Sequence, residues 1–319
     1  MTRTIKRDIP GIDIFKFLMA LAVVLDHFAA IFLPDENAIP VAIRWAMEGP
    51  VPFFFITTGF LTYGIFDDKE KLLRRGLRLL RIWALWILIY LPTDIFSGFG
   101  SGTQPLRTII SLVVDGVTTY SWPLWFLYAM AWFFVIESVL QGRPVLKRFS
   151  RIVYFVSFLL YSYGLYHYDY WLHRLIVLTP IKVFYGCQLI LFGYYIKRWL
   201  DRAQGGTAVL TASLAVSSIV LFAFNLPCWN TLCGAAFFMV ALRIKARPRK
   251  IYLTLRHESM WIYYLHMYIL FAVLMLNVRG VLVLDLWPGL AVTYVAVFVL
   301  SWVLSRLQTR VKALAYLVR

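Results

Sequence analysis

Long apolar runs recur along the whole chain, and they constrain its fold more than any other feature. Each run extends for roughly 17 to 22 residues between short polar stretches, which is the length that an α-helix needs to cross the hydrocarbon core of a bilayer. Hydrophobic residues make up 61% of the 319 positions and charged residues only 15%, which is too apolar for a water-soluble domain of this size. We therefore predict an all-α integral membrane protein.

Hydropathy and turn signals divide the chain into a bundle of about ten transmembrane helices. We expect these spans near residues 12–33, 47–66, 79–96, 122–140, 151–167, 180–199, 207–224, 227–243, 259–277 and 288–306. The stretch 106–118 is expected to form a short re-entrant or surface helix. No linker or soluble appendage remains, so residues 1–319 are predicted to form a single transmembrane domain.

Basic residues gather in alternate loops. Of the 32 lysine and arginine residues, 26 lie at the two ends of the chain and in the loops that follow the second, fourth, sixth and eighth spans. Because loops rich in lysine and arginine stay in the cytoplasm, we predict that both termini are cytoplasmic. The net charge of +16 then reflects membrane topology, and the expected partners are membrane lipids or an anionic cytoplasmic ligand, with no role for nucleic acid.

The first span carries ionisable side chains at membrane depth. Asp26 and His27 lie in "VVLDHFAAIF", and Asp13 and Lys16 lie earlier in the same span. On a helix Lys16 and His27 share one face with Asp13, while Asp26 points sideways. Such groups are costly inside a bilayer and normally face a cavity or a partner. Two interpretations follow: a neutral interior histidine with Asp26 as its structural acceptor, or an Asp-supported imidazole that removes a proton from a hydroxyl.

A one-sided cationic stripe follows the second span, in "KLLRRGLRLLRIW". On a helix its basic side chains project within about 120°, with leucines on the other side; they are Lys71, Arg74, Arg75, Arg78 and Arg81. The stripe is either an anchor that touches lipid phosphates or a site for the phosphates of a bulky donor such as coenzyme A.

Other polar positions are each explained equally well by packing. Thr58 lies in a small, polar patch of the second span, Trp125 lies beside Trp122 at the start of the fourth, and His266 lies in "YYLHMYI" of the ninth. Helix packing accounts for Thr58, and a position at the membrane interface accounts for Trp125. His266 fits an interior histidine with satisfied hydrogen bonds. His167, Asp169 and His173 have no convincing metal-ligand spacing, so we predict no metal site.

Five motifs occur in one order along the chain: "GIDIFKFLMALAVVLDHF", "VPFFFITTGFL", "RRGLRLLR", "LWFL" and "IYYLH". In this order, and with about ten spans, they resemble the acyltransferase 3 family of membrane O-acyltransferases. Short bacterial members are the most similar, including acetylases of glycan precursors and the membrane half of the vancomycin-resistance serine racemases. Where the family pattern has an arginine and a serine, this chain has Lys16 and Thr58.

The resemblance implies a multi-pass enzyme of the bacterial inner (plasma) membrane. It implies an O-acetyltransferase that moves an acyl group from cytoplasmic acetyl-CoA or another acyl-CoA to a hydroxyl of a cell-surface glycan, polysaccharide or cell-wall precursor, which can be lipid-linked. A homo-oligomer is compatible with it, and no metal is expected.

The resemblance also implies a set of site residues. His27 would be the catalytic base, with Asp26, Lys16 and Asp13 in the same catalytic group; Arg74, Arg75, Arg78 and Arg81 would bind the donor, with the Arg-x-x-Arg register open; Thr58, Trp125 and His266 would line the substrate pocket. An alternative stays open at this point, namely an amino-acid or small-molecule permease on the same scaffold, with Asp26, His27 and Lys16 as its substrate or proton site.

Overall fold

The structure is a computed structural model. It describes residues 9–33, 39–98, 105–118, 120–164, 179–202, 206–247, 249–281 and 285–318. Over these ranges the chain is helical and contains no strand. His167, Asp169 and His173 lie outside the described residues.

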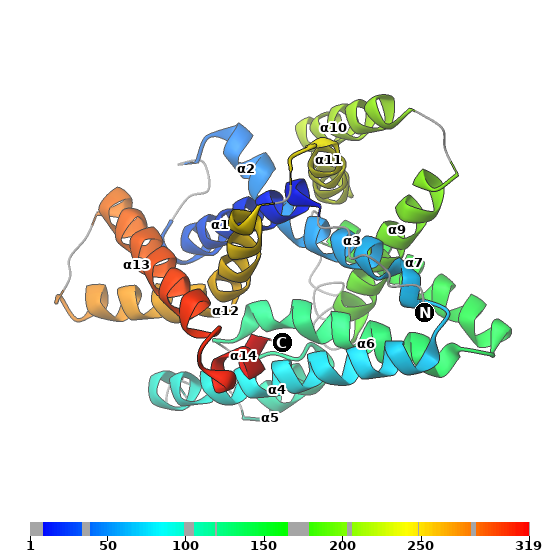
Figure 1. Ribbon diagram of the computed structural model, residues 1–319. Helices are drawn as coiled ribbons and strands as arrows, with labels where there is room; N and C mark the ends of the chain where they lie inside the picture. The colour runs from blue at the N-terminus through cyan, green and yellow to red at the C-terminus, as the bar shows by residue number, and fades with distance from the viewer. Residues whose placement is uncertain are drawn as a thin grey trace.

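The helices follow one another along the chain as Figure 1 shows. They are α1 (Pro10–Phe32), α2 (Val41–Met47), α3 (Pro50–Thr62), η2 (Tyr63–Ile65), α4 (Lys69–Gly98), α5 (Pro105–Val114), η3 (Trp122–Leu124), α6 (Trp125–Leu140), α7 (Pro144–Gly164), α9 (Ile181–Leu200), α10 (Thr207–Ala223), α11 (Trp229–Arg243), α12 (Lys250–Val278), α13 (Leu286–Leu307) and α14 (Lys312–Val318).

Every one of the ten expected spans coincides with a helix, namely α1, α3, α4, α6, α7, α9, α10, α11, α12 and α13. Within the described residues, five segments are long and apolar enough to cross a membrane: Pro10–Phe32, Lys69–Ile95, Trp122–Leu140, Lys250–Val278 and Trp287–Leu307. The prediction of an all-α membrane protein is confirmed. Ten crossings and cytoplasmic termini stay predictions.

Two helices begin about ten residues earlier than expected. The apolar runs predicted starts near residues 79 and 259, but α4 begins at Lys69 and α12 at Lys250. The added turns hold many of the basic residues, whose long side chains favour helix but do not register as apolar. The basic stripe is therefore the continuation of a spanning helix rather than a separate loop.

Close packing between α3 and α9 explains the small residues of the second span. A Cβ atom added at Gly59 would lie 1.8 Å from the carbonyl oxygen of Ile190, and one added at Gly193 would lie 1.9 Å from that of Ile56. Backbones that approach so closely require glycine on both helices. Gly59 thus serves helix contact, and no ligand is needed to explain it.

The long first helix is enclosed by later parts of the chain. α1 packs against α12, α11 and α3, and α4 packs against α6, as Figure 1 shows for α1 and α12 near the centre of the molecule. The last helix, α14, returns to lie against α4 (Figure 1). Segments far apart in the sequence therefore meet around the polar residues of α1.

Candidate active site

Two groups of polar side chains lie on α1. The helix is unbroken from Pro10 to Phe32, so at 1.5 Å per residue Lys16 and His27 are about 16 Å apart along its axis. No lysine side chain spans that separation. The four residues predicted to act together in catalysis therefore form two sites, one with Asp13 and Lys16 and one with Asp26 and His27.

The second of these sites contains an acid and two imidazoles. Nδ1 of His27 lies 3.2 Å from Oδ2 of Asp26, and these side chains are 20% and 38% exposed. The ring of His27 lies 5.2 Å from the ring of His266 on α12, with 22° between their planes. The ring of Trp122 lies 5.2 Å from His27. We call Asp26, His27, His266 and Trp122 the histidine cluster.

His266 is fully buried and has a defined hydrogen bond. Its Nδ1 lies 3.0 Å from the carbonyl oxygen of Ile262, one helical turn earlier, and a carbonyl oxygen only accepts. Nδ1 therefore carries the proton. Its Nε2 is buried and has no hydrogen-bond partner among the described residues.

Trp122 was not singled out by the sequence, which favoured Trp125. The indole Nε1 of Trp122 donates to the Sδ atom of Met267 at 3.1 Å, whereas Trp125 contacts the Nζ atom of Lys182 at 4.6 Å from its ring centroid. The 3-10 turn Trp122–Leu124 that precedes α6 sets these directions. Helical periodicity applied to "SWPLWF" does not predict that turn.

A buried carboxylate holds the turn that carries Trp122. Oδ2 of Asp94, on α4, accepts a hydrogen bond of 2.5 Å from the hydroxyl of Thr118, and its Oδ1 accepts one of 3.0 Å from the backbone N–H of Tyr120. Asp94 is buried. Because both oxygens bind the turn, Asp94 fixes the approach of Trp122 to His27.

The first site on α1 is an ion pair with an adjacent cation. The guanidinium of Arg256, on α12, binds both carboxylate oxygens of Asp13 at 2.8 and 2.7 Å. Lys16 makes no hydrogen bond or ion pair with any described residue, and the charges that act on it are those of Asp13, Arg256 and Arg75. The sequence treated Arg256 as a topological charge, and only the fold reveals its partner. We call Asp13, Lys16 and Arg256 the basic cluster.

A cationic cavity of about 420 Å³ lies near this end of α1. Its lining is Ile65, Lys71, Arg74, Arg75 and Arg78, and we call it the basic cavity. Four of the five residues of the predicted stripe therefore face one space. Since Arg75 also acts electrostatically on Lys16, the basic cavity adjoins the basic cluster.

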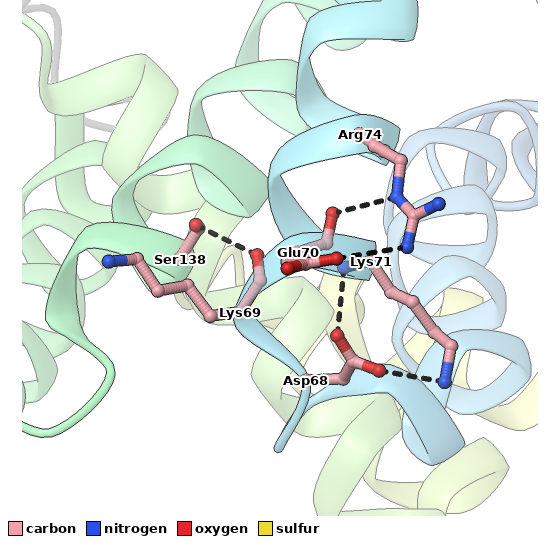
Figure 2. A network of polar contacts seen from close by, with 6 residues as sticks. All are labelled: Asp68, Lys69, Glu70, Lys71, Arg74 and Ser138. Atoms are coloured by element: carbon pink, nitrogen blue, oxygen red, sulfur yellow. Dashed lines mark hydrogen bonds and ion pairs between the residues drawn. The ribbon is translucent and has the colours of Figure 1, made fainter.

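The four cations of the basic cavity differ in their partners. Figure 2 shows Lys71 paired with Asp68 and Arg74 paired with Glu70, at 2.7 and 3.5 Å. Hydrogen bonds from the side chain and the backbone of Lys71 hold the pKa of Asp68 below its ordinary value.

Arg75 and Arg78 have no carboxylate partner in the part of the chain that the structure describes; Arg75 lies over the ring of Phe134 at 5.2 Å. These two guanidinium groups are thus the ones left to bind an external anion.

Arg81 lies outside the basic cavity. Its guanidinium stacks on the ring of Tyr316 of α14, 3.7 Å from the centroid, and donates to the carbonyl oxygen of Tyr316 at 3.5 Å. The indole N–H of Trp86 also donates to α14, at the carbonyl oxygen of Leu317 (3.0 Å). The last helix therefore covers Arg81, the last arginine of the stripe.

A second cavity, of about 800 Å³, opens at the other end of α1. It reaches Asp26 and is lined further by Ala29, Ala30, Leu33, Ile39, Val41, Arg44, Met47, Glu48, Phe222, Ala223, Asn225 and Trp229; we call it the distal cavity. Small residues of α1 leave space directly beside the acid of the histidine cluster. This lining mixes apolar side chains with charges of both signs.

Thr58 lies apart from both cavities, since neither lining includes it. Its hydroxyl donates to the carbonyl oxygen of Phe54 at 2.9 Å, within α3, and also lies 3.4 Å from the Sδ atom of Met130. The hydroxyl is thus already engaged in the helix that carries it.

A helical membrane protein with an acid-paired histidine and an arginine-lined cavity is the class that the fold and these sites define. The family model described as "Acyltransferase domain" (Acyl_transf_3) matches residues 9–306, so this chain belongs to that family and is a membrane acyltransferase. The predicted family is confirmed.

A relative found by sequence comparison agrees with the predicted resemblance to racemases. An "Amino-acid racemase" of Enterococcus faecalis is 30% identical over 157 residues, which are 49% of this chain and 21% of the relative. The chain thus spans about a fifth of that relative's length. No solved structure matches this chain.

Proposed function

We propose that the protein is an O-acyltransferase that takes an acyl group, in the first instance acetyl, from cytoplasmic acyl-CoA and passes it to a hydroxyl of a glycan or cell-wall precursor. One observation carries the proposal: the basic cavity and the distal cavity lie at opposite ends of α1, and the histidine cluster lies between them. A donor and an acceptor can thus approach His27 from opposite sides of the membrane.

The donor's phosphates bind in the basic cavity. Arg75 and Arg78 lack carboxylate partners among the described residues, whereas Lys71 and Arg74 are partly neutralised by Asp68 and Glu70. Guanidinium groups match phosphate oxygens in geometry and charge. We therefore assign the Arg-x-x-Arg register to Arg75 and Arg78, with Lys16 as the next cation toward the interior.

His27 acts as the base. Its Nδ1 faces Asp26, which leaves Nε2 to take the proton of the acceptor hydroxyl while the hydroxyl oxygen attacks the thioester carbon. The carbon–sulfur bond then breaks, and the thiolate of coenzyme A takes the proton from the imidazolium. The products are the ester and coenzyme A, and His27 returns to its starting state.

Trp122 is our choice for the group that binds the developing oxyanion. Lys16 is about 16 Å along the helix from His27, and the hydroxyl of Thr58 is engaged by Phe54. The indole N–H of Trp122 lies in the histidine cluster, and its one hydrogen bond to a described residue goes to the thioether of Met267, which is a weak acceptor. Exchanging that sulfur for an anionic oxygen strengthens the hydrogen bond as the reaction proceeds.

The acceptor enters through the distal cavity. The mixture of apolar and charged lining suits a polar molecule attached to a lipid, and the cavity ends at Asp26, beside the base. Ala29 and Ala30 are the residues whose enlargement would block this route.

Transfer of radiolabel tests the proposal. The purified protein in nanodiscs, given labelled acetyl-CoA and a pool of lipid-linked glycan, should label the pool, and His27→Ala should reduce the rate by about 10² to 10⁴-fold. Thermal unfolding of both proteins controls for folding. Transfer that survives His27→Ala would remove His27 from its role as the base.

A second candidate is an amino-acid permease on the same scaffold, because a relative named for amino-acid racemisation matches half of this chain. In that case Asp26, His27 and Lys16 hold the substrate or a proton. Uptake of labelled serine into proteoliposomes, without binding of acyl-CoA, would favour the permease.

A further inference from the structure

Each of the two stacked imidazoles has one engaged nitrogen and one available nitrogen. Nδ1 of His27 faces Asp26 at 3.2 Å, and Nδ1 of His266 donates to the carbonyl oxygen of Ile262 at 3.0 Å. The nitrogen that remains on either ring is Nε2. Only one of these two nitrogens has a role in the proposed reaction, that of His27.

The Nε2 atom of His266 needs a hydrogen-bond donor. It is fully buried and has no partner among the described residues. A proton on this atom would place a positive charge on a ring that contacts no carboxylate of the described residues, which is costly at full burial. Nε2 is therefore an unpaired acceptor, and an acceptor left without a donor destabilises the protein unless a ligand supplies one.

A single hydroxyl cannot serve both rings, because it has one proton to donate. We infer that the acceptor carries two neighbouring hydrogen-bond donors, as a vicinal diol or a 1,2-amino alcohol does, one for Nε2 of His27 and one for Nε2 of His266. The inference rests on the proposed function, since it concerns the acceptor of that reaction. His27 takes the proton of the reacting hydroxyl, and His266 holds the second donor and so selects and orients the acceptor.

The spacing of the rings suits such a pair of donors. The ring centroids are 5.2 Å apart and the planes are inclined by 22°, so the two acceptor nitrogens belong to neighbouring, nearly parallel rings. Two hydrogen bonds of about 2.8 Å each, made by donors on adjacent carbon atoms, bridge a separation of this size.

Matched small acceptors test the inference on the unaltered protein. The probes are trans-cyclohexane-1,2-diol, cyclohexanol and trans-cyclohexane-1,4-diol, each with labelled acetyl-CoA and the protein in nanodiscs. We expect kcat/KM for the 1,2-diol to exceed that of cyclohexanol by about 10- to 100-fold, since cyclohexanol leaves the buried Nε2 without a donor. The 1,4-diol shows how the rate depends on the spacing of the two hydroxyl groups, and equal rates for all three would overturn the inference.

Two variants of His266 sharpen the test. His266→Gln keeps an acceptor near the position of Nε2, whereas His266→Asn keeps only a donor toward Ile262. The preference for the 1,2-diol over cyclohexanol, measured as the ratio of the two kcat/KM values, should persist in part in the first variant and disappear in the second. A preference that persists fully in His266→Asn would overturn the inference. If neither variant folds, the three acceptors with the unaltered protein decide.

Failure of the inference differs from failure of the proposed function. A labelled glycan pool together with no labelling of the 1,2-diol overturns the inference alone. No transfer of label to any acceptor, glycan included, overturns the proposed function.

Discussion

The polar residues at the two ends of α1 differ in how fully their hydrogen-bonding atoms are paired. In the basic cluster the acid is saturated, because Arg256 binds both oxygens of Asp13. In the histidine cluster the imidazoles keep an available nitrogen each, and the acid partner is 38% exposed and lines the distal cavity. Removal of one partner from a saturated buried pair destabilises a fold, whereas available groups next to a cavity can act on a ligand. We therefore expect Asp13 to contribute to stability and His27 to catalysis.

The largest expected effect is on stability, at the basic cluster. Asp13→Ala leaves the guanidinium of Arg256 without its bidentate partner, so the free energy of unfolding should fall by about 3–5 kcal/mol. Thermal unfolding in detergent measures it. The double variant Asp13→Ala with Arg256→Met should recover much of the loss. A stable Asp13→Ala protein with abolished kcat would instead place Asp13 in the reaction.

The next effect is on rate, at the histidine cluster. Trp122→Phe removes the indole N–H assigned to the oxyanion, so kcat should fall by about 10² to 10³-fold with little change in stability. Trp125→Phe is the matched control, because Trp125 contacts Lys182 instead of His27. Steady-state kinetics with acetyl-CoA separates the two. Equal losses in both variants would contradict the assignment.

A smaller effect on kcat is expected from Asp94, which binds the turn before Trp122 and is not itself part of the histidine cluster. Asp94→Asn weakens the hydrogen bonds to Thr118 and Tyr120, which costs about 1–2 kcal/mol and lowers kcat by about tenfold. In the background of Trp122→Phe the same change should have no further effect on kcat, because Asp94 acts through Trp122. Additive losses in the double variant would show that Asp94 acts by another route.

The smallest effect is expected where α14 covers Arg81. Tyr316→Ala removes a cation–π contact of about 0.5–1 kcal/mol and should leave the affinity for coenzyme A within about twofold of the unaltered value. Fluorescence titration with a coenzyme A analogue measures it. A large gain in affinity would show that Arg81 joins the donor site once α14 is displaced.

The positions of the helices could be predicted from the sequence, but most contacts between helices could not. All ten apolar runs are helical because run length and the absence of strand periodicity are local signals. The shared face of Lys16 and His27 followed from helical geometry, and the same geometry already implied their separation of about 16 Å.

Contacts between segments that are far apart in the chain could not be predicted from the sequence. Arg256 meets Asp13 across more than 240 positions, and His266 meets His27 because α12 packs on α1. The position of Trp122 depends on a 3-10 turn, and the covering of Arg81 depends on the return of α14. Each of these contacts is decided by tertiary packing.

The most direct test measures both the binding of coenzyme A and acetyl transfer in the same variants. It asks whether the basic cavity binds the donor while His27 acts in the transfer step. The variants are His27→Ala, the pair Arg75→Ala with Arg78→Ala, and the control pair Arg143→Ala with Arg148→Ala, which removes the same charge from exposed positions of the chain.

We expect His27→Ala to bind coenzyme A with an unchanged Kd but to transfer acetyl about 10² to 10⁴-fold more slowly. The Arg75 and Arg78 pair should raise Kd at least about tenfold, and the control pair should change neither quantity. Loss of binding in His27→Ala, or unchanged binding in the Arg75 and Arg78 pair, would contradict these assignments.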